Sequence, residues 1–158
     1  MIRIFSVALL VLAGCGVYSF SPSGKPPFES VNVPQFENNT IEYQLSDKLT
    51  DAVVDAFIKD NTVKIQEPSL AEAILFGTVA AYRRDPYTYN QEDIVSEYAV
   101  KVTLHVKVMK ANSEEIIWEE DFFAQGIYKA DEETEEDGQD RAIAILTADI
   151  MDRTTKTW

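Results

Sequence analysis

Residues 94–128 alternate between apolar and polar side chains with a period of two, which is typical of strands with one buried face. The apolar positions of the first half are Tyr98, Val100, Val102, Leu104, Val106 and Val108. Residues 116–128 continue the alternation, and residues 110–114 between the halves have the polar composition of a hairpin loop. The pattern therefore predicts a long antiparallel hairpin on which the rest of the chain packs.

Two further segments have the spacing of amphipathic helices. In residues 42–60 an apolar side chain recurs at every fourth position, at Leu45, Leu49, Val53 and Phe57. We expect Asn39 to cap this helix with Glu42 reaching back, and Asn61 to end it in a left-handed conformation. Binding to a membrane surface is the alternative, but an acidic polar face favours packing on a core. Residues 132–155 form the second predicted helix, with acidic residues at its start, where the helix dipole favours them.

The remaining strands are shorter or less regular. Residues 30–34 and 63–66 are predicted short strands, and residues 36–40 a loop. Residues 73–82 are apolar on both alternating faces, which favours a central strand covered on two sides. Gly77 within it indicates a bulge or a close backbone approach. Residues 83–91 are polar and aromatic, and we expect them to form a connector into the hairpin.

These elements define one fold class. The chain has 158 residues, 46% of them hydrophobic, which is enough for one domain with a core of its own. Taken in order, the elements predict an α+β domain over residues 28–158. We expect two helices packed on one face of a mixed four- or five-stranded sheet, in the order β-α-β-β-β-β-α.

The first 27 residues have the composition of an export signal and a tether. Residues 1–14 contain Arg3, an apolar run over residues 4–12 that is too short to span a bilayer, and then small residues, which predicts a secretory signal peptide. The sequence Leu-Ala-Gly-Cys at 12–15 resembles a bacterial lipobox, so Cys15 is the predicted lipidation site. A buried free cysteine in an N-terminal helix is the alternative. Gly16 follows in place of the aspartate associated with inner-membrane retention, so the resemblance to bacterial lipoproteins implies sorting to the outer membrane. Residues 15–27 form the predicted lipidated tether.

Charge and residue usage exclude several function classes. With 27 acidic against 14 basic residues, the net charge of -13 disfavours nucleic acid and bare anionic membrane as partners. A single histidine cannot form a multi-histidine metal site, and we expect no Ser-His-Asp or Cys-His arrangement around it. Residues 133–138 loosely follow an EF-hand loop, but Ala144 stands where a bidentate glutamate is needed, so helix-start acids are the better interpretation. We expect no enzyme activity, no metal and no cofactor.

Four segments together resemble the LptE family of lipopolysaccharide-assembly lipoproteins. They are CGVYSF at 15–20, VNVPQFENNT at 31–40, AEAILFGTV at 71–79 and WEEDF at 118–122. The resemblance implies a lipid-anchored protein on the periplasmic side of the outer membrane that plugs the LptD barrel. There it would help the barrel assemble and help lipopolysaccharide reach the cell surface. A lipid- or solute-binding accessory lipoprotein of another envelope transport complex is the alternative.

Two groups of residues are candidates for contact with lipopolysaccharide or with the barrel. Arg83 and Arg84, with Tyr82, Tyr87 and Tyr89, combine guanidinium groups that suit phosphates with rings that stack on sugars. A solvated loop with an Arg84–Asp85 pair is the alternative for this group. The second group is predicted to lie on one face of a strand, opposite the valines, and consists of Lys101, His105 and Lys107. We expect this strip to face the barrel wall or lumen.

Overall fold

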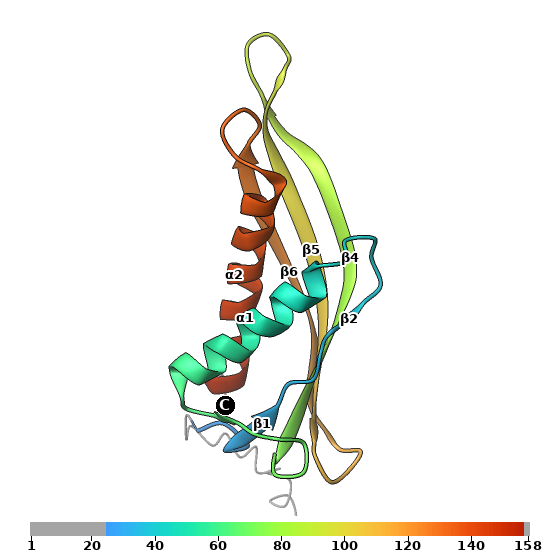
Figure 1. Ribbon diagram of the computed structural model, residues 1–158, viewed down its shortest axis with the longest axis vertical. Coiled ribbons are helices and arrows are strands. Elements are labelled where there is room, and N and C mark those ends of the chain that lie inside the picture. The colour runs from blue at the N-terminus through green and yellow to red at the C-terminus, as the bar shows by residue number, and fades with distance from the viewer. Residues whose placement is uncertain (1–24, 157–158) are drawn as a thin grey trace, which may run out of the picture.

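The computed structural model describes residues 25–156, which form six strands and two helices (Figure 1). In chain order these are β1 (Ser30–Asn32), β2 (Glu37–Asn38), α1 (Leu45–Asp60), β3 (Lys64–Ile65), β4 (Ala73–Tyr89), β5 (Val95–Lys110), β6 (Ile116–Lys129) and α2 (Glu135–Thr155). Both helices lie on one face of the sheet, so the predicted α+β class is confirmed. The predicted signal peptide and Cys15 lie outside the described residues.

The sheet is mixed, with strand order β3-β1-β4-β5-β6 and β2 beside β4. β5 and β6 form the predicted hairpin, and β4 pairs antiparallel with the other side of β5. The short strands pair in parallel, β1 with β3 and β4, and β2 with β4. β2 was missed, because residues 36–40 were predicted to be a loop. The N–H of Asn39 donates to the carbonyl of Val79 at 3.0 Å, which fixes this segment against the sheet.

The core fills the space between the sheet and the two helices. The even-numbered side chains of β5 from Val100 to Val108 are fully buried, as their alternation predicted. The four-residue repeat of α1 is fully buried too, and α2 contributes Ala142, Leu146 and Ile150. Each large aliphatic side chain buried in this way stabilises the fold by about 1.5–3 kcal/mol.

Glycines mark two close approaches in the core. A Cβ at Gly77 would lie 2.6 Å from the ring of Phe36, so the approach predicted there is made by a side chain. A Cβ at Gly126 of β6 would lie 1.8 Å from the carbonyl oxygen of Gly138, near the start of α2. Because Gly126 has no side chain, the backbone of α2 can pack directly against β6.

Two predictions about β4 were wrong. Residues 83–89 continue the strand instead of forming a connector, and their pairing with β5 extends to Tyr89 opposite Val95. Pro86 is tolerated because this half of β4 has a described neighbour on one side only and because the register shifts beside Pro86. The strand is also not covered on two sides: Phe76 and Ala80 are exposed, since both helices lie on the opposite face.

The helix ends combine one wrong prediction with two confirmed ones. α1 begins at Leu45, and its N-cap residue Gln44 makes no side-chain cap bond, so the predicted Asn39 cap is wrong. The predicted left-handed end at Asn61 is present, and its N–H donates to the carbonyl of Phe57 at 2.9 Å. The acids that begin α2 are helix-start residues, because Asp137 completes a capping box with Thr134.

Candidate functional site: the open sheet face

The face of β4, β5 and β6 that the helices leave uncovered carries half of the predicted contact residues. Residues directly opposite one another on paired strands share a face, so the strand register identifies its members. We define the open sheet face as Phe76, Thr78, Arg83, Asp85, Lys101, Thr103, His105, Lys107, Glu119, Asp121, Phe123 and Gln125. Lys101, His105 and Lys107 therefore do lie on one strand face opposite the buried valines, as predicted.

Asp85 holds two of the cations on this face. Its carboxylate lies 3.0 Å from Nζ of Lys101 and 3.2 Å from a guanidinium nitrogen of Arg83. The hydrogen bond from Lys101 and the charge of Arg83 lower the pKa of Asp85. The single carboxylate thus offsets part of the positive charge of both cations, which weakens their attraction for a separate phosphate group.

His105 lies between two carboxylates of β6. Its Nδ1 is 2.7 Å from an oxygen of Asp121, and its Nε2 is 2.9 Å from an oxygen of Glu119. The hydrogen bond with Asp121, and then that with Glu119, raise the pKa of His105 against the opposing effect of burial. Both ring nitrogens face acceptors, so the arrangement favours the imidazolium form, which donates from both.

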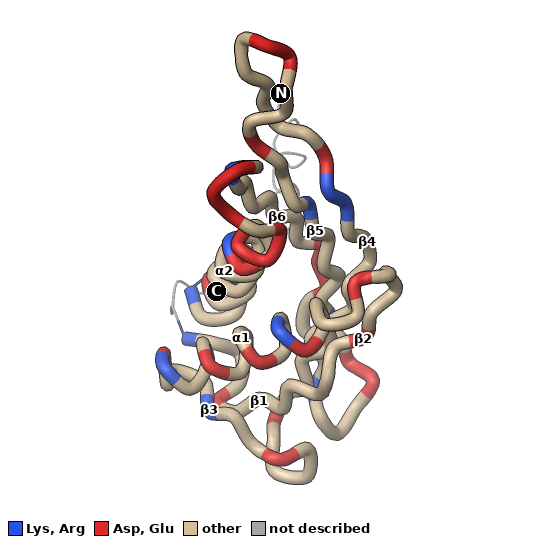
Figure 2. Tube along the Cα trace, turned by 45° about the horizontal axis from the view of Figure 1, so that its top comes forward, with Lys and Arg blue, Asp and Glu red and all other residues tan. Residues whose placement is uncertain are grey.

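The charges of this face nearly balance, although the chain as a whole is strongly acidic. Its cations Arg83, Lys101 and Lys107 match its three carboxylates in number, and protonated His105 adds one positive charge, whereas the chain has a net charge of -13. Figure 2 shows acidic residues spread over much of the remaining trace, with a dense run leading into α2. Two aromatic side chains, Phe76 and Phe123, are exposed on the face. A balanced, partly aromatic surface is suited to contact with another protein.

Tyr82 and Arg84 do not lie on the open sheet face, because they point toward α2. The guanidinium of Arg84 stacks 3.6 Å above the ring of Tyr98, and its Nε donates to the hydroxyl of Tyr128 at 2.5 Å. It also lies 3.5 Å from Glu135 of α2, so the Arg84–Asp85 pair weighed from the sequence is not formed.

Tyr82 completes this connection between β4 and α2. Its hydroxyl donates to Glu135 at 2.5 Å and accepts from the side chain of Gln139 at 3.1 Å. Burial, followed by the hydrogen bond to Glu135, raises the pKa of Tyr82. Tyr82 and Arg84 are therefore occupied in holding α2 on the sheet.

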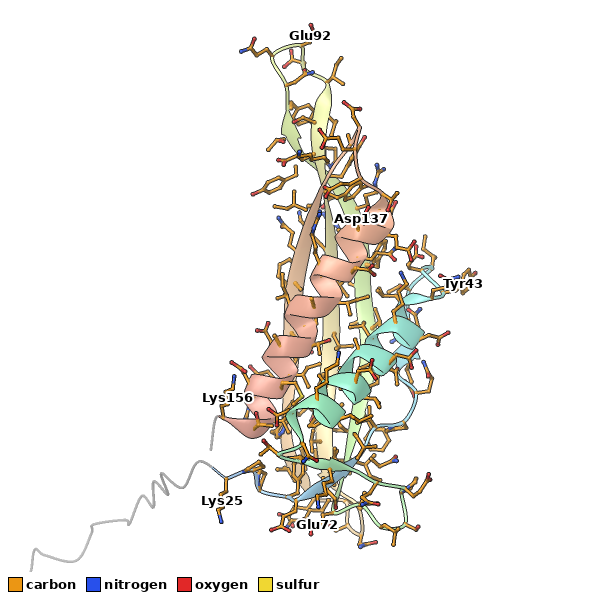
Figure 3. The ribbon with its side chains drawn as sticks, turned by 60° about the vertical axis from the view of Figure 1, so that its left-hand side comes forward. Lys25, Tyr43, Glu72, Glu92, Asp137 and Lys156 are labelled. Atoms are coloured by element: carbon orange, nitrogen blue, oxygen red, sulfur yellow. The ribbon has the colours of Figure 1, made fainter. Side chains whose placement is uncertain are left out.

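The two other predicted tyrosines lie near the end of the hairpin formed by β4 and β5. Tyr87 and Tyr89 are exposed, and the tip around Glu92 projects beyond Asp137 at the start of α2 (Figure 3). The predicted contact residues are thus divided among the open sheet face, the connection to α2 and this tip. Polar composition favoured one connector that would hold these residues together, but alternation along a strand sends neighbouring side chains to opposite faces.

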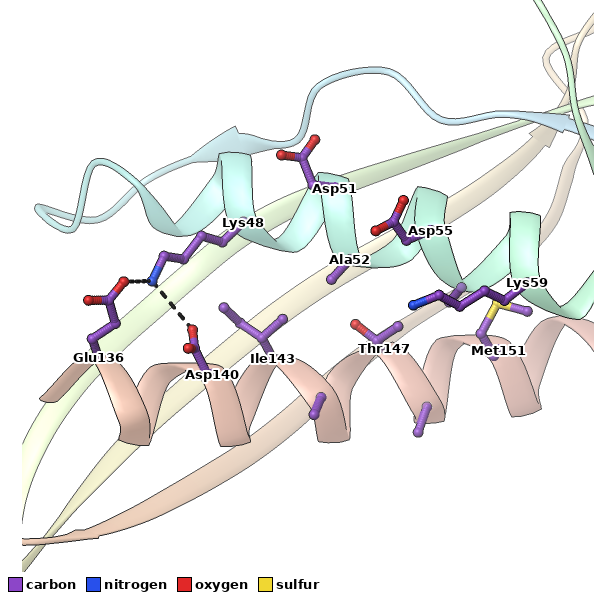
Figure 4. A pocket seen from close by; sticks show the side chains of 13 residues that line it. Lys48, Asp51, Ala52, Asp55, Lys59, Glu136, Asp140, Ile143, Thr147 and Met151 are labelled. Atoms are coloured by element: carbon purple, nitrogen blue, oxygen red, sulfur yellow. Dashed lines mark hydrogen bonds and ion pairs between the residues drawn. The ribbon is translucent and has the colours of Figure 1, made fainter. Parts of the chain in front are cut away.

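A groove of about 760 Å³ between α1 and α2 was not predicted (Figure 4). Small side chains on both helices contribute to its lining, namely Ala52, Ala56, Ala144 and Ala148. Lys48 closes one end through ion pairs with Glu136 at 2.5 Å and Asp140 at 3.3 Å. The alanines recur at every fourth position on each helix, and this spacing is the signal in the sequence from which the groove follows.

Two findings limit the chemistry of the described part of the chain. Within residues 25–156, no three His, Cys, Asp or Glu side chains gather as ligands for a metal ion. Neither α1 nor α2 is long and apolar enough to cross a membrane.

Comparison with known proteins identifies a family and a shared fold. The model of the LptE family, described as lipopolysaccharide-assembly, matches residues 28–154. A solved structure from Xanthomonas campestris is similar, with a TM-score of 0.64 at 12% identity over 85% of this chain and 87% of that one. The uncharacterized lipoprotein B of Nitrosomonas europaea has a TM-score of 0.54 at 12% identity, covering 83% and 87%.

A minor lipoprotein of Acinetobacter baumannii also has this fold, with a TM-score of 0.50 at 15% identity over 81% of this chain and 91% of that one. No curated protein sequence matches the chain. At such low identities, the structural likenesses establish the fold alone.

Proposed function

The chain belongs to the LptE family of lipopolysaccharide-assembly lipoproteins, which are not enzymes, and from this premise we propose that it plugs an LptD-like outer-membrane barrel. In this role it helps the barrel to assemble and helps lipopolysaccharide to reach the cell surface. The observation that carries the proposal is the open sheet face, a large polar surface that neither helix covers.

The chemistry of that face favours a protein that encloses it. Lys101 and Arg83 are paired with Asp85, and His105 is held between Asp121 and Glu119, so little free positive charge remains for a polyanion. A barrel wall needs shape and polar complementarity instead, and the exposed rings of this face add apolar contact area. Direct binding of lipopolysaccharide by the predicted contact residues is therefore secondary in this proposal.

The proposed anchor places the domain on the periplasmic side of the outer membrane. Removal of residues 1–14 and lipidation of Cys15 would leave a tether that leads into the domain, where Phe28 is the first buried side chain of the described chain. Two or three acyl chains hold a protein on a membrane stably, because each buried methylene contributes about 0.8 kcal/mol. Mass spectrometry of the mature protein tests this, since an uncleaved or unacylated chain would refute the anchor.

Charge reversal on the open sheet face tests the plug. We expect the double variant Lys101→Glu/Lys107→Glu to fold and to retain far less barrel protein than the wild type on copurification, because it turns a balanced face acidic. The matched control, Lys59→Glu/Lys64→Glu, makes the same change of charge on α1 and β3 and should retain the barrel. Equal barrel recovery with both double variants would contradict the proposed contact surface.

The groove between α1 and α2 favours a second candidate, a lipid- or solute-binding accessory role. Its alanines are apolar and its volume suits a small ligand. If this role is the true one, the wild-type protein purified from its membrane should carry a small molecule, detectable by native mass spectrometry. The variant Ala144→Trp, which adds a large ring to the lining of the groove, should lose that molecule while barrel recovery stays unchanged.

A further inference from the structure

The segment between β2 and α1 exposes two large apolar side chains. Ile41 and Tyr43 are each 86% exposed, more than any other large hydrophobic side chain in residues 25–156. We call residues 39–44 the knuckle. Single exposed apolar residues are common on protein surfaces. Two large apolar side chains that are almost fully exposed on one short segment are unusual and suggest a contact surface.

The knuckle is held in place by hydrogen bonds, so this exposure is built into the fold. Oδ1 of Asn38 accepts from the N–H of Thr40 at 2.9 Å and from its hydroxyl at 2.8 Å. Nδ2 of Asn38 donates to the carbonyl of Glu42 at 2.7 Å, and the N–H of Asn39 donates to the carbonyl of Val79. Asn38 thus braces both sides of Ile41.

The core beside the knuckle is already filled. Phe36 precedes it and Leu45 follows it, and both are buried. Ile41 and Tyr43 therefore have no place to turn inward without displacing one of these side chains or breaking the Asn38 bonds. A surface ordered in advance loses little conformational entropy on binding, and tyrosine is enriched among the residues that dominate binding energy.

The knuckle lies at one edge of the sheet. It begins where β2 leaves β4, and beyond Val79 this edge of β4 has no strand partner among the described residues. Tyr43 lies at the periphery of the molecule in Figure 3, away from α2. This edge borders the open sheet face, so a partner that encloses that face would also reach the knuckle.

The flanking charges select the kind of partner. Glu37, Glu42 and Asp47 surround the two apolar side chains in sequence, and none of the three forms an ion pair with a described residue. Resting on the function proposed above, we propose that Ile41 and Tyr43 insert into an apolar pocket with a basic rim in the wall of the barrel protein. An anionic lipid surface is disfavoured, because three acids would be brought against it.

Substitution of the pair tests this proposal. We expect Ile41→Ser/Tyr43→Ser to keep the wild-type melting temperature, since both side chains are exposed, and to reduce barrel recovery tenfold or more on copurification. The matched control is Leu70→Ser/Ile58→Ser, which removes side chains that are 69% and 60% exposed elsewhere on the surface. Its barrel recovery should stay within twofold of the wild type.

The possible failures can be told apart. If the wild-type protein recovers no barrel, the proposed function fails; if wild type and knuckle variant recover it equally, only the knuckle proposal is refuted. An equal loss in the control would refute it too, because general surface hydrophobicity would then explain the binding. A wild-type dimer that the knuckle variant abolishes, with barrel recovery unchanged, would assign the pair to self-association and overturn the proposal.

Discussion

The close packing of the α2 backbone on β6 can be tested by adding one methyl group at their contact, with the substitution Gly126→Ala. The new Cβ would lie 1.8 Å from the carbonyl oxygen of Gly138 and 2.8 Å from its carbonyl carbon, whereas real Cβ contacts essentially never fall below 3.0 Å. The atoms in conflict belong to the backbone of α2, so no side chain can rotate out of the way.

The geometry sets the size of the effect. To restore a 3.0 Å contact, α2 must move away from β6 by about 1.2 Å, which loosens the packing of Ala142 and Leu146 behind it. Overpacking of this kind costs about 1–3 kcal/mol, and a conflict with backbone belongs at the upper end. At about 3 kcal/mol, the melting temperature of a domain this size should fall by roughly 10 °C.

The assay is thermal or urea unfolding followed by circular dichroism. Gly138→Ala serves as the comparison, since its Cβ would meet the side chains of Tyr128 at 2.7 Å and Val100 at 3.1 Å, and the helix gains stability from alanine. We expect it to destabilise the protein less than Gly126→Ala does. A Gly126→Ala variant as stable as the wild type would refute the close seating of α2.

Three other substitutions, the last with a matched control, have expected effects on stability. His105→Gln should lower the melting temperature at pH 5.5 but not at pH 9. Because folding raises the pKa of His105, the stabilisation by its charged form is complete below the pKa of the unfolded chain, near 6.5. It is lost as the pH rises through the pKa of the folded protein. A pH-independent difference in melting scans would contradict this. Thr134→Ala removes the capping box and should cost about 1 kcal/mol in urea unfolding. Arg84→Met removes the stacking on Tyr98 and leaves the buried Tyr128 hydroxyl without its donor, which should cost about 1–2 kcal/mol, whereas Arg83→Met should cost almost nothing.

The predictable part of the fold is the part with a long repeat. Six alternating apolar positions in β5 and a four-residue repeat in α1 leave little choice of period or face, and both elements were identified correctly. The prediction that the acids before α2 are helix-start residues was correct as well, and it rested on the helix dipole. The capping box of Thr134 and Asp137 was not predicted.

The features that were missed depend on contacts between segments far apart in the chain. β2 has two residues and no period, and it exists only because β4 lies beside it. Pro86 and the charges around it suggested a loop, but pairing with β5 outweighs local composition. The division of Arg83 and Arg84 between opposite faces follows once residues 83–89 are known to be a strand. Nothing in the local pattern marked Ile41 and Tyr43 as exposed.

The most direct measurement of the proposed function is site-specific photocrosslinking in living cells at Thr103, in the middle of the open sheet face. Thr103 lies opposite Phe123 on β6, and it alternates with buried Val102 and Leu104, so a photoreactive side chain there is on the face opposite the core. We expect irradiation to join the lipoprotein to one large outer-membrane barrel protein, with the adduct lost when that barrel is depleted. A folded, lipidated protein that yields no such adduct from Thr103 would contradict the proposal that this face is enclosed by a barrel.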